Sequence, residues 1–158
     1  MAAHSPPALR PRLIRPGEGQ TVTAGADALT VKLSDVDTDG AFTVGLALLQ
    51  PGQGLPPHVH HREDELFIVL DGELEVWTPE GTFTARGGDL VFLPAEAPHT
   101  HRNLGPGPVR FYWFANPSGF EHFSADYAAA LGSPSGLGPA QLAELGEQYG
   151  VEFLPGTP

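Results

Sequence analysis

The residue types best suited to chemistry are gathered between positions 58 and 65. His58, His60 and His61 stand within four positions, and the acidic run 63–65 follows at once. Successive side chains of a β-strand point to opposite faces, so His58 and His60 would share one face and His61 would point away. Glu65 opens the next apolar run and can return to the same region. Two imidazoles and a carboxylate suit a divalent transition metal ion, whereas a solvated polar loop is the alternative.

A second pair of histidines follows a proline-bounded turn further along the chain. His99 and His101 come after the turn at 94–98, and they share one parity if they lie on a strand. A third imidazole from this strand would complete a set of three histidines and one glutamate. Segments so far apart in sequence meet only in a closed or nearly closed sheet.

The elements around these histidines are short, rich in apolar and β-branched residues, and separated by turns. Asp71-Gly72 joins two such runs and is a strong hairpin signal. The runs are ELFIVL (65–70), ELEVW (73–77), TFTAR (82–86), DLVFLP (89–94) and VRFYWFA (109–115). With 20 glycines and 17 prolines in 158 residues, the pattern predicts an all-β sandwich or barrel in one domain.

The two ends of the chain differ in composition from this central region. Residues 1–11 are expected to be a flexible segment, residues 12–116 the β-barrel, and residues 117–158 a helical extension. Ser118 and Glu121 match a capping box. The extension is therefore predicted to contain two short helices.

An aromatic stripe at helical spacing runs along the first of these helices. It includes Phe120, Phe123 and Tyr127, and it is expected to pack on the barrel or on a second subunit. The chain is accordingly expected to form a two-fold homodimer, with a barrel face or the sheet edge near 13–33 as the contact.

Composition excludes several classes of function. The net charge of −11 disfavours both nucleic acids and anionic membrane surfaces as partners. The absence of cysteine excludes disulfides, thiolate catalysis and iron–sulfur clusters. No apolar run approaches the length of a membrane span or of a signal peptide, so a cytoplasmic location is expected.

The spacing around the first histidine cluster resembles the first motif of the cupin family. That motif has a glycine, five residues, His-x-His, three or four residues, a glutamate, six residues and a glycine. Here Gly52, His58, His60, Glu65 and Gly72 match every fixed position.

The second cupin motif is matched around the second histidine pair. Gly88, Pro94, His99 and Asn103 have the spacing of the motif. Glu96 stands where the motif has its second glycine, which serves a turn.

The resemblance implies a double-stranded β-helix, or jelly-roll barrel, with one divalent transition metal ion inside. It implies these ligands for the ion: His58, His60, Glu65 and His99. Three imidazoles and a carboxylate accept Mn, Fe, Co, Ni, Cu or Zn, so the metal is not identified. His61 is expected outside this set. For His101 the sequence leaves open whether it joins the site. For the strand 109–114 it leaves open which face lines the pocket.

Within the family, the chain looks most like the quercetin 2,3-dioxygenase-like group of small single-domain cupins. The resemblance implies a metal-dependent dioxygenase that acts on a flavonol-like or other enolisable aromatic substrate, with Glu65 as both ligand and base. A cupin isomerase and a non-catalytic small-molecule-binding cupin are the alternatives, because the fold does not fix a reaction.

Overall fold

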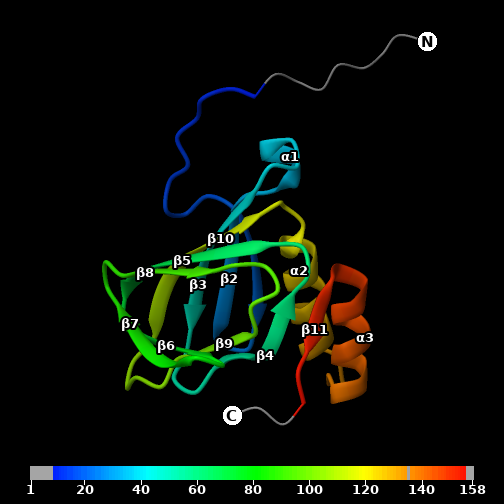
Figure 1. Ribbon diagram of the computed structural model, residues 1–158. Coiled ribbons are helices and arrows are strands. Elements are labelled where there is room, and N and C mark those ends of the chain that lie inside the picture. The colour runs from blue at the N-terminus through cyan, green and yellow to red at the C-terminus, as the bar shows by residue number, and fades with distance from the viewer. Residues whose placement is uncertain (1–8, 135, 156–158) are drawn as a thin grey trace, which may run out of the picture.

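Two antiparallel sheets face each other in the computed structural model, which describes residues 9–134 and 136–155 (Figure 1). The larger sheet has the order β1 (Gln20–Ala24), β2 (Asp27–Leu33), β3 (Thr43–Leu49), β10 (Val109–Asn116), β5 (Asp64–Asp71) and β8 (Leu90–Leu93). The smaller sheet has the order β11 (Val151–Phe153), β4 (Gly54–His60), β9 (His99–Arg102), β6 (Glu73–Thr78) and β7 (Gly81–Arg86). The predicted all-β double-stranded β-helix is confirmed. Of the predicted flexible segment 1–11, residues 1–8 lie outside the described residues.

The hairpin predicted at Asp71-Gly72 is wrong. β5 pairs with β10 and β8, whereas β6 pairs with β7 and β9 in the other sheet. The chain therefore turns a corner between the sheets at this point. Gly72 has a φ of 83°, and a Cβ there would lie 2.7 Å from the carbonyl oxygen of Pro108. The glycine is needed for the tight corner, a requirement that sequence alone does not separate from a hairpin turn.

The core lies between the two sheets and settles which face of β10 points inward. Val109, Phe111 and Trp113 are at most 3% exposed, whereas Arg110 is exposed on the opposite face. Residues of β5, β6, β7 and β8 complete the core, among them Phe67, Val69, Leu74, Val76, Ala85, Val91 and Leu93.

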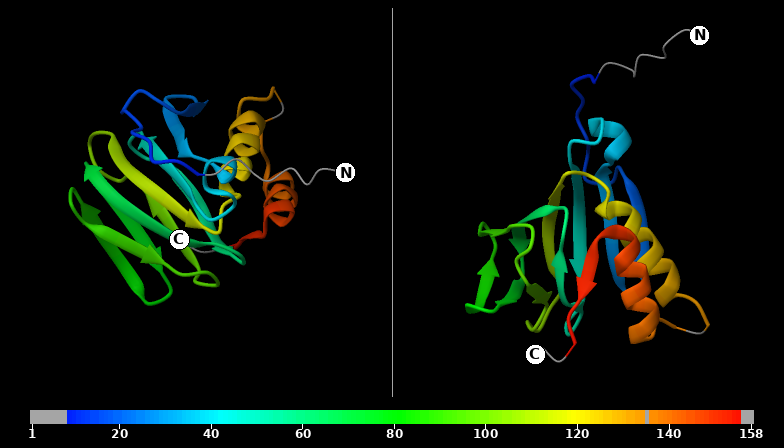
Figure 2. Two further views of the ribbon diagram at one scale, coloured as in Figure 1. Left: turned by 90° about the horizontal axis from the view of Figure 1, so that it is seen from above. Right: turned by 45° about the vertical axis from the view of Figure 1, so that its right-hand side comes forward.

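Two helices follow the barrel, as predicted: α2 (Phe120–Leu131) and α3 (Pro139–Tyr149). Figure 2 shows them side by side along one flank of the sheets. The predicted capping box of Ser118 and Glu121 is wrong, because Gly119 is the N-cap of α2. Glu121 instead accepts hydrogen bonds from the amides of Gly119 and Asp35, the latter at the start of the one-turn helix α1 (Asp35–Thr38).

The aromatic stripe of α2 packs within the chain itself. Phe120 stacks on Phe123 with ring centroids 5.1 Å apart, and Phe123 stacks on Tyr127 at 5.7 Å. Beyond the helices the chain forms β11, which pairs with β4 and which the sequence analysis did not predict. Among the described residues, no helix is both long and apolar enough to cross a membrane.

Candidate metal centre

Three strands bring the predicted ligands together. His58 and His60 share one face of β4, and His58 lies directly opposite His99 on the neighbouring strand β9. The bend after His60 carries the chain across to the larger sheet, where Glu65 stands at the start of β5. The alternation of side chains along β4 and the crossing of the chain between the two facing sheets therefore account for the convergence.

The four side chains form a compact buried cluster. The ligand atoms of His58, His60, Glu65 and His99 all lie within 4.8 Å of one another, and none of the residues is more than 3% exposed. His58 Nε2 is 3.1 Å from His60 Nε2. Glu65 Oε2 lies 3.3 Å from His60 Nε2 and 3.2 Å from His99 Nε2.

The outer ring nitrogens are held so that each Nε2 points to the centre of the cluster. His58 Nδ1 lies 2.7 Å from the carbonyl oxygen of Pro56, and His99 Nδ1 lies 2.9 Å from that of Ala97. A carbonyl oxygen can only accept, so both Nδ1 atoms carry the proton and both Nε2 atoms present a lone pair.

Glu63 takes the corresponding place behind His60, and the sequence analysis missed it. Its side chain is 1% exposed, and Glu63 Oε2 lies 3.5 Å from His60 Nδ1, an ion-pair contact that is longer than a normal hydrogen bond. A carboxylate at this position favours a proton on Nδ1 and a free Nε2. The acidic run beside His61 was visible in the sequence, but nothing in it separated Glu63 from its exposed neighbour Asp64.

The electrostatics of the cluster favour a cation at its centre. Burial lowers the pKa of His60, but the Glu65 and Glu63 carboxylates outweigh burial and raise that pKa to about 9. Burial raises the pKa of Glu65, but His60 and His99 outweigh it and hold the pKa well below its usual range. Burial, together with the two neighbouring imidazoles, lowers the pKa of His58.

The donor set therefore fits a divalent transition metal ion. Two imidazole nitrogens 3.1 Å apart, each with a lone pair directed inward, repel unless a proton or a cation lies between them. A divalent ion supplies that charge to all four groups at once, and nitrogen and carboxylate ligands suit Mn, Fe, Co, Ni, Cu and Zn.

The other two histidines of the motifs lie outside the cluster. His61 is on the surface, where its ring nitrogens contact Glu96 Oε2 at 2.9 Å and Glu152 Oε2 at 3.1 Å. His101 lies deeper between the sheets, beside the rings of Phe67 and Phe111. Burial lowers the pKa of His101 to about 4, so its imidazole is neutral at pH 7.

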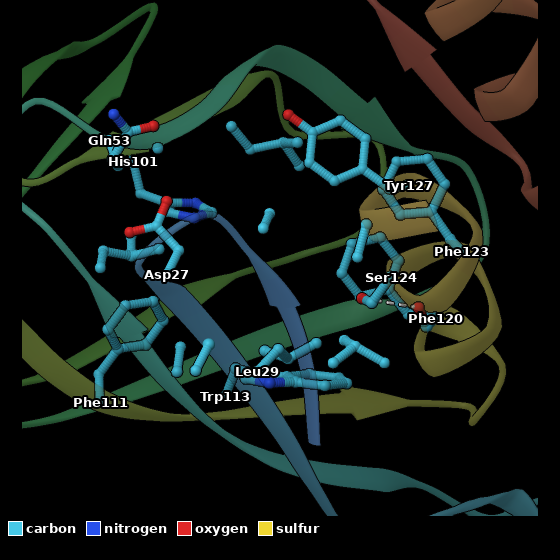
Figure 3. Close-up of a pocket in the computed structure, with 18 of the residues that line it drawn as sticks. Asp27, Leu29, Gln53, His101, Phe111, Trp113, Phe120, Phe123, Ser124 and Tyr127 are labelled. Carbon is cyan, nitrogen blue, oxygen red and sulfur yellow. Dashed lines mark hydrogen bonds between the residues drawn. The ribbon is translucent and has the colours of Figure 1, made fainter. Parts of the chain in front are cut away.

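A mostly apolar cavity of about 160 Å³ adjoins the cluster (Figure 3). Its aromatic walls are Phe67, Phe111, Trp113, Phe120, Phe123 and Tyr127, the last three from α2. Glu65 belongs to the cavity lining as well as to the cluster, and His101 enters from another wall. A small molecule in this cavity would therefore lie against the Glu65 side of the cluster.

Comparisons with known proteins agree with this geometry. Residues 45–115 match the family described as "Cupin domain". Quercetin 2,3-dioxygenase from Bacillus subtilis (strain 168) is 33% identical over 103 residues, which cover 65% of this chain and 31% of that relative. The chain thus spans less than a third of that enzyme.

Another relative is matched over most of its length. The polyketide synthase CurC of Streptomyces cyaneus is 30% identical over 111 residues, covering 69% of this chain and 71% of that protein.

Solved structures share the fold at low sequence identity. KdgF from a Halomonas species has a TM-score of 0.61 at 16% identity, covering 70% of this chain and 99% of that chain. A predicted oxalate decarboxylase from Thermotoga maritima has a TM-score of 0.60 at 19% identity, covering 67% of this chain and 99% of that chain. Fold, motif region and buried histidine–glutamate cluster agree, and this chain belongs to the cupin superfamily.

Proposed function

We propose that this chain is a metal-dependent dioxygenase that acts on a small enolisable hydroxy-aromatic compound. The proposed metal ligands are His58, His60, Glu65 and His99. The observation that carries the proposal is the double position of Glu65, whose carboxylate belongs both to the donor cluster and to the lining of an aromatic cavity. The similarity to quercetin 2,3-dioxygenase supports the same class of reaction.

Glu65 is the proposed base for the substrate hydroxyl. Its lowered pKa keeps the carboxylate ionised at neutral pH, which is the state that accepts a proton. The same low pKa makes Glu65 a weak base, so the hydroxyl must be acidified to transfer its proton. A bound divalent ion supplies that effect, because it lowers the pKa of a coordinated hydroxyl.

The remaining walls of the cavity would hold the substrate and exclude water. Aromatic rings from α2 face Phe111 and Trp113 across the cavity (Figure 3), and a flat ring fits between such walls. Asp27, Gln53 and Tyr127 bring polar side chains to the lining. The chain's own contribution is thus placement of the ring with its acidic hydroxyl against Glu65.

Oxygen uptake tests the proposal directly. Protein reconstituted separately with each of the six metals is assayed with quercetin and with 3,4-dihydroxybenzaldehyde in an oxygen electrode. We expect uptake with at least one metal and none after chelation. Glu65→Gln is expected to lower kcat by about 100-fold or more while losing much less metal, because an amide ligates weakly but is a very poor base.

The double variant His58→Ala, His99→Ala serves as the metal control. It is expected to remain folded and to lose stoichiometric metal by elemental analysis, because two of the four donors are gone. Metal content near that of the wild type would reject the ligand assignment. Equal losses of turnover and metal in Glu65→Gln would reject the base role.

A second candidate function is chemistry on an enolisable carbonyl compound without dioxygen, such as isomerisation. The similarity to the polyketide synthase CurC, matched over 71% of that relative, supports a substrate of this kind, because polyketide chains carry enolisable carbonyl groups. Turnover of a substrate under anaerobic conditions would distinguish it from the dioxygenase. Binding without any turnover would instead favour the non-catalytic small-molecule-binding cupin.

A homodimer is also proposed for this chain. The cytoplasmic location stays a prediction.

A further inference from the structure

The space beside Glu65 has room for one ring, whereas the flavonol that the family resemblance implies has three. Its volume is about 160 Å³. An engineered apolar cavity of about 150 Å³ holds one benzene ring, whereas pockets for drug-sized ligands start at about 300 Å³. This space therefore matches one ring, and the rest of a flavonol would have to extend through the open side of the cavity.

The charge of the lining restricts the substrate further. Glu65 and Asp27 line the cavity, and among the described lining residues there is no lysine or arginine. A phosphate or a carboxylate on the part of the ligand that lies away from the metal cluster would therefore be desolvated without a partner, which is costly. The lining favours a neutral compound.

Two buried nitrogens of the lining have no hydrogen-bond partner among the residues that the structure describes. They are Nδ1 of His101 and Nε1 of Trp113. Leaving a buried donor or acceptor unpaired is costly, and native structures rarely keep such groups without a reason. Figure 3 shows both rings at the cavity, on walls other than the one formed by α2.

The position of Trp113 is fixed by its cross-strand neighbour. Gly45 lies directly opposite Trp113 on β3. A Cβ at Gly45 would lie 2.1 Å from Trp113 Nε1, so the indole lies over the bare backbone of the glycine. The indole N–H can only donate, so its missing partner is an acceptor such as an oxygen atom.

We propose that the cavity takes a neutral compound with a single aromatic ring, and that His101 and Trp113 hydrogen-bond an oxygen substituent on that ring away from Glu65. This inference rests on the proposed function for the acidic hydroxyl that faces Glu65. His101 and Trp113 are positioning residues, because they contact the substrate away from the reacting hydroxyl.

Binding calorimetry on zinc-loaded protein tests this without turnover, because Zn²⁺ is not redox active. Three probes are compared: 3,4-dihydroxybenzaldehyde, 4-methylcatechol and quercetin. The first two are single-ring catechols that differ in the carbonyl oxygen, and the third has three rings. We expect the aldehyde to bind at least tenfold more tightly than quercetin.

Variants separate hydrogen bonding from general packing. His101→Phe is expected to weaken binding of the aldehyde about tenfold and to leave 4-methylcatechol within about twofold, because only the aldehyde loses a hydrogen bond. Trp113→Phe is expected to show the same selectivity with a loss of about threefold, and it carries the test if His101→Phe does not fold. His61→Phe, a surface change, is the matched control and should bind both probes as the wild type does.

Two results would overturn the inference: quercetin binding as tightly as the aldehyde, or an equal loss for both catechols in the folded variants. The outcome is separable from that of the oxygen assay. Tight aldehyde binding without oxygen uptake would reject the dioxygenase and keep this inference. Oxygen uptake with quercetin together with weak aldehyde binding would reject this inference and keep the dioxygenase.

Discussion

The orientation of three imidazoles decides whether the buried cluster can hold a metal ion. His58 and His99 are each fixed through Nδ1 by a backbone carbonyl oxygen. His60 relies instead on a side chain, Glu63, at 3.5 Å. The carbonyl contacts are insensitive to mutation of a side chain, so Glu63 is the one of these three outer partners that mutagenesis can remove.

Glu63→Gln is therefore expected to weaken metal affinity by about 10- to 100-fold, the usual effect of losing an outer partner of a ligating histidine. The variant keeps the shape of the side chain but removes the charge that favours a proton on His60 Nδ1. Competition for Zn²⁺ against a chromophoric chelator measures the affinity. Asp64→Asn is the matched control, because Asp64 is the exposed neighbour in the same acidic run. Equal affinities of the two variants would contradict the role of Glu63.

At the level of the element, the turn between β8 and β9 places His99. Glu96 in this turn has a φ of 67°, and its amide donates to the carbonyl oxygen of His60 at 2.8 Å. The left-handed conformation is the one that glycine adopts at this motif position at no steric cost. Glutamate therefore keeps the turn geometry in this chain and accepts the backbone strain.

Comparison of Glu96→Gly with Glu96→Ala isolates that strain. Both variants lose the contact between Glu96 and His61, so that contact cancels in the comparison. The glycine variant is expected to be more stable than the alanine variant by about 1 kcal/mol, because only alanine carries a Cβ into the left-handed region. Urea unfolding measures the difference. An alanine variant as stable as the glycine variant would show that the turn relaxes.

Two helices are joined by an ion pair whose strength depends on pH. His122 Nε2 of α2 lies 3.0 Å from Asp35 Oδ2 of α1. The hydrogen bond raises the pKa of His122 and lowers the pKa of Asp35. Glu121 and Asp126 also raise the pKa of His122, and Asp37 acts against the lowering at Asp35.

The signs of these shifts define the pH window of the pair. Because folding raises the pKa of His122, its contribution to the free energy of unfolding is fully present below about pH 6.5. That contribution is lost as the pH rises through the pKa of His122 in the folded state. Because folding lowers the pKa of Asp35, its contribution to the free energy of unfolding is lost as the pH falls through the pKa of Asp35 in the folded state. His122→Gln should thus lower the free energy of unfolding by about 0.2–1 kcal/mol at pH 5.5, the range of exposed pairs. Urea unfolding at pH 9 should show a smaller loss, and equal losses would contradict the linkage.

Local patterns and long-range pairing differ in how far the sequence predicts them. The parity of His58 and His60 and the motif spacing of Glu65 and His99 correctly placed four distant side chains in one cluster. The corner at Asp71-Gly72 was misread, because its local signal is the same for a hairpin and for a crossing between sheets. Strand β11 was missed, because three residues carry no period and pair only through tertiary contact.

At the scale of the whole molecule, the exposed apolar surface that a partner could cover lies on a face of the barrel and not on α2. The aromatic stripe of α2 lines the cavity, and Phe123 is 1% exposed, so the stripe is not free to cover a second subunit. The outer face of β5 and β8 carries exposed apolar side chains instead. They are Ile68, Leu70, Leu90 and Phe92, and Ile68 lies directly opposite Leu90 across the two strands.

The two-fold homodimer is therefore predicted to form through this outer face of β5 and β8. Leu90 and Phe92 are each 59% exposed, and contiguous apolar surface of this kind commonly marks an interface. β8 is also the edge strand of the larger sheet, where unpaired backbone groups invite a partner. Light scattering at micromolar concentration should give about twice the 16.7 kDa of the chain.

The double variant Leu90→Lys, Phe92→Lys should be a monomer, because like charges brought together at a two-fold axis repel and are costly to desolvate. Leu104→Lys is the matched control, since Leu104 is 60% exposed but lies in the loop after β9. It should leave the mass unchanged. A wild-type mass of 16.7 kDa across a tenfold dilution series would reject the dimer. A dimer that persists in the double variant would place the interface on another face.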